Sequence, residues 1–224
     1  MKTAPTENWT STDHYLNTHL VKEGAALQSA ASSIENTNLP RMEVSPTLGK
    51  FLYMLAKMNG AKRILELGTF YGYSTIWLAK ALPEDGVIIS MEMTERFVHI
   101  AQENVNRAGL SHKVKLLHGD GEHLLNGLIR DKIKPFDMIF IDAHKPSYPL
   151  FLKLALQLAK PGTVIIGDNV ILNGELPNQD NQNPKVAAVR QFIEALGEEV
   201  TLESTALQTV GIKGYDGFTI SIVK

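Results

Sequence analysis

Short apolar runs alternate with helix-like segments along most of the chain. Five of these runs are RILELG (63–68), GVIISME (86–92), KVKLLHG (113–119), FDMIFIDA (136–143) and GTVIIGD (162–168). Strands that are apolar almost throughout are typical of a parallel sheet covered by helices on both faces. Two more strand candidates near the C-terminus have no helix between them, so we expect them to close the sheet as an antiparallel pair. The pattern predicts an α/β fold with a mostly parallel, seven-stranded sheet.

Helices are predicted before the first strand. Residues 10–34 carry apolar positions at helical spacing. A further helix is predicted to begin after Ser45, a good N-cap with Pro46 at the first helical position, and to end at Asn59-Gly60.

After the fifth apolar run comes a long polar segment, NVILNGELPNQDNQNPK (169–185). Loops of this length inside a compact domain tend to be lids or binding loops.

Length and composition limit the possible classes of protein. A chain of 224 residues is long enough for one well-buried α/β domain and short for two. We expect one domain over residues 1–224, with an N-terminal helical extension (1–60) and an α/β core (61–224). The absence of cysteine excludes disulfides, thiolate catalysis and zinc–sulfur sites.

Charge and hydropathy bear on partners and location. The 22 basic and 24 acidic residues are interspersed, without the basic stripe typical of nucleic-acid binding. The N-terminus lacks the apolar core of a signal peptide, and no run approaches the roughly 18 apolar residues of a membrane span. We therefore expect a soluble, cytoplasmic protein that acts on a small molecule, without nucleic-acid or membrane partners.

A glycine turn follows the first predicted strand in ILELGTFYGYST. Gly68 and Gly72 allow a tight turn and close approach of a ligand, and the helix that opens at Ser74 offers free N–H groups. The spacing alone is equally compatible with a turn that binds nothing. The position favours a cofactor cradle, because ligands of open parallel sheets lie beyond the carboxyl ends of the strands, beside the switch in strand order.

Acidic residues at the strand ends favour a nucleoside cofactor. Glu92 ends the second predicted strand, where a carboxylate can accept hydrogen bonds from both ribose hydroxyls, and Asp120 ends the third. The dinucleotide fingerprint G-x-G-x-x-G is absent from this turn, and Glu66 would lie awkwardly beside phosphates. S-adenosylmethionine therefore fits better than a nicotinamide cofactor.

Oxygen ligands follow the fourth and fifth strands. Asp142, Asp168 and Asn169 would be neighbours if these strands pair. Such a set suits Mg²⁺ best, with Ca²⁺ or Mn²⁺ as alternatives. Residues of these types also commonly cap the helices that follow strands, which is the competing interpretation.

His144 and Lys145 follow Asp142 closely. Beside a divalent cation the ammonium form of Lys145 is disfavoured by like-charge repulsion, which would suit it as a general base. An ordinary solvated lysine is the alternative. We interpret His144 as a structural or cofactor-flanking residue rather than a metal ligand.

With these residues, the chain resembles a known family, the cation-dependent class I O-methyltransferases typified by caffeoyl-CoA O-methyltransferase and, more distantly, catechol O-methyltransferase. The motifs that carry the resemblance are RMEVSPTLGKFL, ILELGTFYGYST, LPEDGVIISMEM, FIDAHKPSY, GDNVILNG and GYDGFTISIV. The resemblance implies a Rossmann-like class I methyltransferase fold. It also implies methyl transfer from S-adenosylmethionine to a phenolic, catechol-type substrate, and a homodimer.

The resemblance assigns roles to individual positions. Asp142, Asp168 and Asn169 match metal ligands, and Lys145 matches the catalytic base. The positions that match cofactor-binding residues are Met42, Val44, Glu66, Gly68, Tyr71, Ser74, Glu92, Gly121, Asp142 and His144. Asn173 and Tyr148 match positions near the substrate.

The chain departs from the family pattern at one of these positions. Relatives of the caffeoyl-CoA type usually have DADK where this chain has DAHK, so His144 replaces an aspartate that contacts the cofactor. We expect this exchange to affect cofactor affinity or its pH dependence. Two other readings stay open: a methyltransferase of the same fold acting on a non-catechol hydroxyl, and a non-catalytic S-adenosylmethionine-binding protein.

Overall fold

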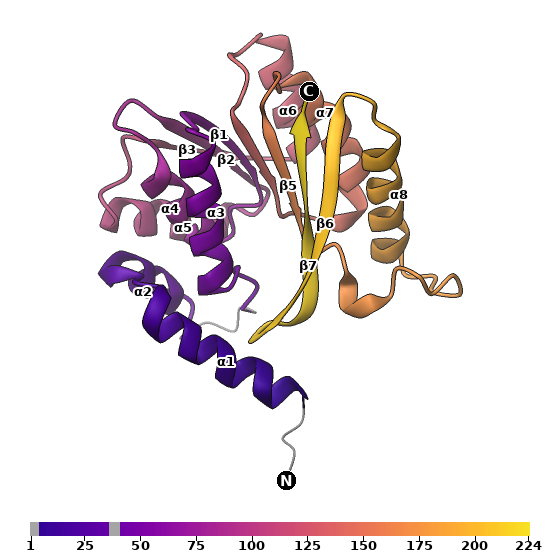
Figure 1. Ribbon diagram of the computed structural model, residues 1–224. Helices are drawn as coiled ribbons and strands as arrows, with labels where there is room; N and C mark the ends of the chain where they lie inside the picture. The colour runs from indigo at the N-terminus through magenta and orange to yellow at the C-terminus, as the bar shows by residue number, and fades with distance from the viewer. Residues whose placement is uncertain (1–4, 36–40) are drawn as a thin grey trace.

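A computed structural model describes residues 5–35 and 41–224, and it contains one sheet with helices on both faces (Figure 1). The strands are β1 (Arg63–Leu67), β2 (Val87–Glu92), β3 (Val114–His118), β4 (Met138–Ile141), β5 (Val164–Asp168), β6 (Leu202–Gly211) and β7 (Gly214–Val223). The helices are α1 (Pro5–Leu20), α2 (Gly24–Ser32), α3 (Pro46–Met58), α4 (Tyr73–Ala81), α5 (Glu95–Arg107), α6 (Gly121–Arg130), α7 (Tyr148–Gln157) and α8 (Pro184–Glu198). Short 3-10 helices span Lys145–Ser147 and Leu172–Gly174.

The strand order is β3-β2-β1-β4-β5-β7-β6. The first five strands run parallel, and β7 pairs antiparallel with both β5 and β6. The predicted α/β class, with its mostly parallel sheet and antiparallel C-terminal pair, is confirmed. The order reverses between β1 and β4, so a crevice is expected beyond their carboxyl ends.

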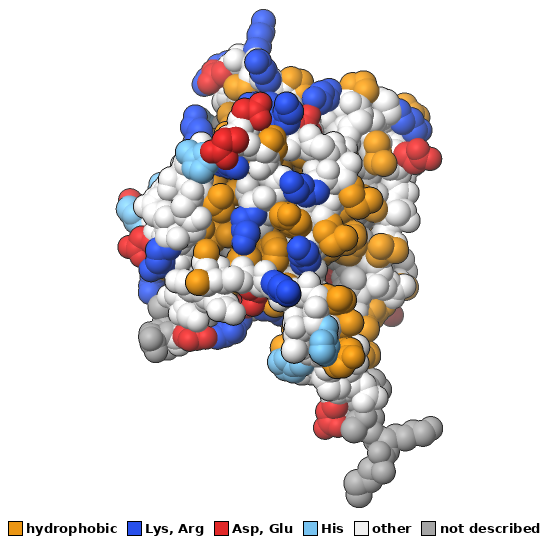
Figure 2. All heavy atoms as spheres, turned by 60° about the vertical axis from the view of Figure 1, so that its left-hand side comes forward, with side chains coloured by type: hydrophobic (Ala, Val, Ile, Leu, Met, Phe, Trp, Pro, Cys, Tyr) orange, Lys and Arg blue, Asp and Glu red, His pale blue; other side chains and the backbone are white. Residues whose placement is uncertain are grey.

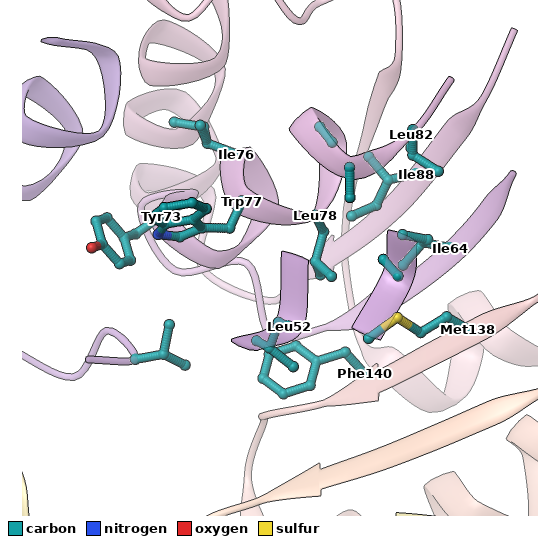
Figure 3. Packing of buried hydrophobic residues seen from close by; sticks show 14 of the residues in the cluster. Leu52, Ile64, Tyr73, Ile76, Trp77, Leu78, Leu82, Ile88, Met138 and Phe140 are labelled. Atoms are coloured by element: carbon teal, nitrogen blue, oxygen red, sulfur yellow. The ribbon is translucent and has the colours of Figure 1, made fainter. Parts of the chain in front are cut away.

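Residues of the central strands β1, β2, β4 and β5 face two separate hydrophobic clusters. In β4, Met138 and Phe140 belong to one cluster, whereas Ile139 and Ile141 belong to the other. The first cluster packs the sheet against α2, α3 and α4, and Figure 3 shows Leu52 and Trp77 among its members. The second packs the sheet against α6, α7 and α8. Burial on both faces explains why these strands are apolar throughout.

The chain before β1 differs in one respect from the prediction. Residues 10–34 were expected to be continuously helical, but α1 ends at Leu20 and α2 begins at Gly24. Gly24 has φ +72°, a left-handed conformation that interrupts a helix. The apolar spacing continues across the break, so periodicity alone did not reveal it. The polar residues 36–40 that were expected to link this region to α3 lie outside the described part.

The two C-terminal strands, β6 and β7, have ten residues each. They form a hairpin whose turn lies at Ile212 and Lys213. The hairpin tip contacts the N-terminal helix, because the Asp13 carboxylate accepts a hydrogen bond from the Ile212 amide at 2.7 Å. Asp13 is buried in this contact. The first and last elements of the described chain therefore lie against each other.

The molecular surface is mixed in character. The face drawn in Figure 2 carries basic, acidic and hydrophobic side chains together. Within residues 5–35 and 41–224, no helix is long and apolar enough to cross a membrane.

The predicted start and end of α3 are confirmed, and they give a test of local stability. The Ser45 hydroxyl accepts a hydrogen bond from the Leu48 amide at 3.2 Å, whereas the Thr94 side chain at the N-cap of α5 makes no such bond. We expect Ser45→Ala to lower the free energy of unfolding by about 1 kcal/mol. The matched Thr94→Ala should cost only a few tenths of that, as measured by urea denaturation. Equal losses in the two variants would contradict the assignment of the Ser45 cap.

Candidate active site

A cavity of about 1040 Å³ opens beyond the carboxyl ends of the parallel strands. It is walled by the turn after β1, the ends of β2, β4 and β5, the helix α1 and the β6–β7 hairpin. The residues predicted as functional that line it are Met42, Val44, Gly68, Ser74, Glu92, Gly121, Asp142, His144, Lys145, Asp168 and Asn169. The structure thus brings most of the predicted residues into one cavity.

The turn after β1 needs glycine for a steric reason. Gly68 has φ +100°, and a Cβ there would lie 1.8 Å from the carbonyl oxygen of Asp142. The Asp142 amide in turn donates to the carbonyl of Leu67 at 2.8 Å. The backbones that leave β1 and β4 therefore touch, and both Gly68 and Asp142 line the cavity.

Glu92 holds the glycine turn from the neighbouring strand. Its Oε2 accepts a hydrogen bond from the Phe70 amide and its Oε1 accepts one from the Thr94 amide, each at 2.9 Å. The carboxylate also lines the cavity, so it retains lone pairs that can face a bound molecule. The predicted contact of Glu92 with a ribose stays a prediction.

Glu66 is fully buried and does not belong to the cavity lining. Its carboxylate accepts hydrogen bonds from the hydroxyls of Ser74 (2.6 Å), Thr75 (2.5 Å) and Ser90 (2.6 Å). Burial raises the pKa of Glu66 from 4.5 to about 7, although these three bonds oppose the rise. The Glu66 carboxylate therefore links β1 to β2 and to the start of α4 through hydrogen bonds, outside the cavity lining.

Three other predicted residues also lie outside the cavity lining. Tyr71 and Tyr148 are fully buried, and burial raises the pKa of both phenols. Asn173 is exposed on the loop after β5, with φ +57°. The roles predicted for them in cofactor and substrate binding stay predictions.

Asp142 and Asp168 form a pair of like charges where β4 and β5 end. These strands pair with Ile141 beside Gly167, one residue before each aspartate. Asp168 is only 4% exposed, and burial together with the charge of Asp142 raises its pKa from 3.8 to about 8. Asp142 is partly exposed, but a buried carboxylate such as Asp168 beside a second acid is costly without a compensating cation.

The donor set around this pair fits a hard divalent cation. Asn169 lies next to Asp168, lines the same cavity and adopts φ +52°. Among the described residues, no cluster of three or more His, Cys, Asp or Glu side chains could hold a metal ion. The predicted set has two carboxylates with an amide as its third member, a composition that suits oxygen-seeking ions such as Mg²⁺.

Lys145 lies directly beside the acidic pair. Its Nζ is 3.3 Å from Oδ1 of Asp142 and donates to the hydroxyl of Tyr148 at 2.6 Å. The Lys145 side chain is only 11% exposed, so it is not an ordinary solvated lysine. His144, in contrast, is exposed where it lines the cavity.

Asp216 is a cavity-lining residue that the sequence reasoning did not single out. Its Oδ1 accepts hydrogen bonds from the amides of Ile171 (2.9 Å), Leu172 (3.1 Å) and Gly217 (2.9 Å). Leu172 has φ +51°, so this carboxylate holds a strained part of the loop after β5. The signal was present in the GYDGFTISIV motif, where an aspartate interrupts a strand pattern.

The sheet order and the cavity at its switch point are those of a class I S-adenosylmethionine-dependent methyltransferase. The chain belongs to the O-methyltransferase family, whose model matches residues 17–221. A catechol O-methyltransferase of Niastella koreensis is 44% identical over 214 residues, which cover 96% of this chain and 97% of the relative. The predicted resemblance is therefore confirmed, and the protein is an S-adenosylmethionine-dependent O-methyltransferase.

Solved structures agree with this assignment. The O-methyltransferase of Bacillus cereus in complex with SAH is 43% identical, with a TM-score of 0.95 over 98% of this chain and 100% of that one. The O-methyltransferase TomG of Streptomyces achromogenes, involved in tomaymycin synthesis and solved in complex with SAM, is 42% identical, with a TM-score of 0.96 over 99% and 100% of the two chains.

The buried position of Glu66 gives a prediction on pH. A pKa raised from 4.5 to about 7 means that the folded state favours the protonated carboxyl. The stability from this group is fully present below pH 4.5 and is lost as the pH rises through 7, by about 3 kcal/mol in total. We expect unmodified protein to lose stability relative to Glu66→Gln over this range, as measured by urea denaturation at several pH values. The exposed Glu103→Gln control should instead follow the unmodified protein, and a parallel Glu66→Gln curve would contradict the prediction.

Proposed function

We propose that this O-methyltransferase acts on a catechol-type small molecule, that it uses a divalent cation held by Asp142, Asp168 and Asn169, and that Lys145 is its general base. The observation that carries the proposal is the pair formed by the buried Asp168 and the partly exposed Asp142, with Lys145 beside it, in a cavity that the glycine turn also lines. The homodimer, the cytoplasmic location and the division into extension and core stay predictions.

The proton balance of methyl transfer explains why a base is useful. When bound, S-adenosylmethionine supplies a methyl group on a positively charged sulfur, and a bound divalent cation makes a neighbouring hydroxyl more acidic. Transfer of this methyl group to the acceptor oxygen would leave neutral S-adenosylhomocysteine and would release the hydroxyl proton. The hydroxyl proton passes to Nζ of Lys145, and the cavity walls hold the two reactants in line.

The substrate class is supported by the donor set and by one relative. A catechol carries hydroxyls on two adjacent ring carbons, so both oxygens can bind a single cation together. The similar protein of Niastella koreensis bears the name catechol O-methyltransferase. A panel of vicinal diphenols and matched monophenols, assayed with labelled S-adenosylmethionine, tests this part directly. Equal turnover of monophenols would exclude the catechol proposal and favour another hydroxyl acceptor.

Removal of a carboxylate should abolish stabilisation by the metal. At a Mg²⁺ concentration of 100 times the dissociation constant, we expect the unmodified protein to gain about 2.7 kcal/mol, seen as a rise in Tm that EDTA reverses. Asp142→Asn and Asp168→Asn should lose this rise, because each removes one of the two charges. The exposed Asp131→Asn should keep it. An equal rise in all four proteins would contradict the metal site.

Loss of the base should affect turnover more than binding. We expect Lys145→Met to lower kcat by about 100-fold or more, since general-base catalysis typically contributes this much. Binding of S-adenosylmethionine, measured by calorimetry, should be nearly unchanged. The exposed Lys153→Met, on α7 but outside the cavity lining, serves as a control with unchanged kcat. Retention of kcat in Lys145→Met would refute the role of the base.

A further inference from the structure

Tyr148 was predicted to lie near the substrate, but the structure places it behind Lys145. Its side chain is fully buried at the start of α7, and its ring lies edge-on to Phe192 with centroids 5.2 Å apart. The Nζ of Lys145 is 4.6 Å from the centre of the Tyr148 ring. Lys145 lines the cavity and Tyr148 does not, so a substrate in the cavity reaches the lysine first.

The hydrogen count of the Tyr148 hydroxyl fixes its role toward Lys145. The hydroxyl lies 2.9 Å from the carbonyl oxygens of Ile141 and Asp168, which can only accept hydrogen bonds. A phenol has a single hydrogen, and these carbonyls take it. Toward Lys145 the Tyr148 oxygen therefore presents a lone pair, and the lysine Nζ is the donor at 2.6 Å.

The same count applies to Nζ of Lys145. The nitrogen is tetrahedral, with one position used by its own carbon. Tyr148 accepts from a second position and Asp142 Oδ1, at 3.3 Å, from a third. One position remains, and proton transfer with a molecule in the cavity has to take place there. Without the phenol oxygen, the nitrogen would be free to rotate and present that position elsewhere.

We propose that Tyr148 is a positioning residue that aims Nζ of Lys145 at the acceptor hydroxyl, and that it does not contact the substrate. The inference rests on the proposed function, in which Lys145 is the base. The Tyr148 hydroxyl also bonds to the carbonyls of Ile141 and Asp168, at the ends of the strands that carry both carboxylates. The Tyr148 hydroxyl is therefore bonded both to Lys145 and to the strand ends that carry Asp142 and Asp168, and it fixes the lysine relative to the two carboxylates.

The first test removes the hydroxyl with Tyr148→Phe. We expect kcat to fall on the order of 10-fold, the scale of one lost orienting hydrogen bond, with the KM of the acceptor unchanged. Tyr53→Phe removes a phenol hydroxyl from α3 outside the cavity lining, and should leave kcat unchanged. A raised KM with unchanged kcat in Tyr148→Phe would indicate a substrate contact and overturn the proposal.

The second test asks whether Tyr148 acts through Lys145. Combined with Lys145→Met, the Tyr148→Phe change should cause no further loss of kcat, because the group that it positions is gone. A further 10-fold loss in the double variant would show an independent effect and overturn the proposal. If Lys145→Met alone keeps full kcat, the proposed function fails. If only Tyr148→Phe keeps it, the positioning role fails alone.

A third variant separates positioning from a purely structural role. Tyr148→4-aminophenylalanine keeps N–H donors for the two carbonyls, but its nitrogen is a poor acceptor for Lys145. We expect its Tm to be close to that of the unmodified protein while kcat stays low. This variant also keeps the test decisive if Tyr148→Phe does not fold. Recovery of kcat together with Tm would show that the phenol only joins the strands, and would overturn the proposal.

Discussion

The contact between the backbones of β1 and β4 is the constraint on which the rest of the site depends. Gly68 lies so close to the carbonyl of Asp142 that no side chain could occupy the space between them. The contact sits where the strand order reverses, so it fixes the place at which the two halves of the sheet diverge. It also fixes the start of the segment that carries Asp142 and Lys145. The glycine turn and the proposed catalytic segment therefore both begin at this backbone contact.

Two buried carboxyl groups near this contact have different surroundings, which suit one to a structural role and the other to cation binding. Glu66 and Asp168 are both buried, and burial raises the pKa of both. Three hydroxyls surround Glu66, so its polar atoms are satisfied within the protein. Asp168 instead faces the like charge of Asp142 and lines the cavity. A carboxyl that is hydrogen-bonded within the protein stabilises the fold, whereas a carboxyl beside a like charge is suited to bind a cation.

Much of the fold and the edge of the sheet that forms the cavity were predictable from sequence. Apolar runs identify strands buried on both faces, and parallel strands bring their carboxyl ends to one edge, which is why Asp142, Asp168 and Lys145 were expected together. The pattern does not show which side of a turn a side chain faces. Glu66 is predicted among the cofactor contacts, and its hydrogen bonds to three hydroxyls could not be read from the sequence. The role of Asp216 depends on amides about 45 residues away in sequence, which no local pattern reveals.

The link between Asp13 and Ile212 joins residues 199 positions apart. Asp13 lies on α1, and both α1 and the β6–β7 hairpin contribute to the cavity wall. During synthesis the N-terminal helix emerges from the ribosome long before its partner exists. The wall can close only after the segment around Ile212 has been made, so binding of the methyl donor in a complete cavity has to wait for synthesis of the β6–β7 hairpin.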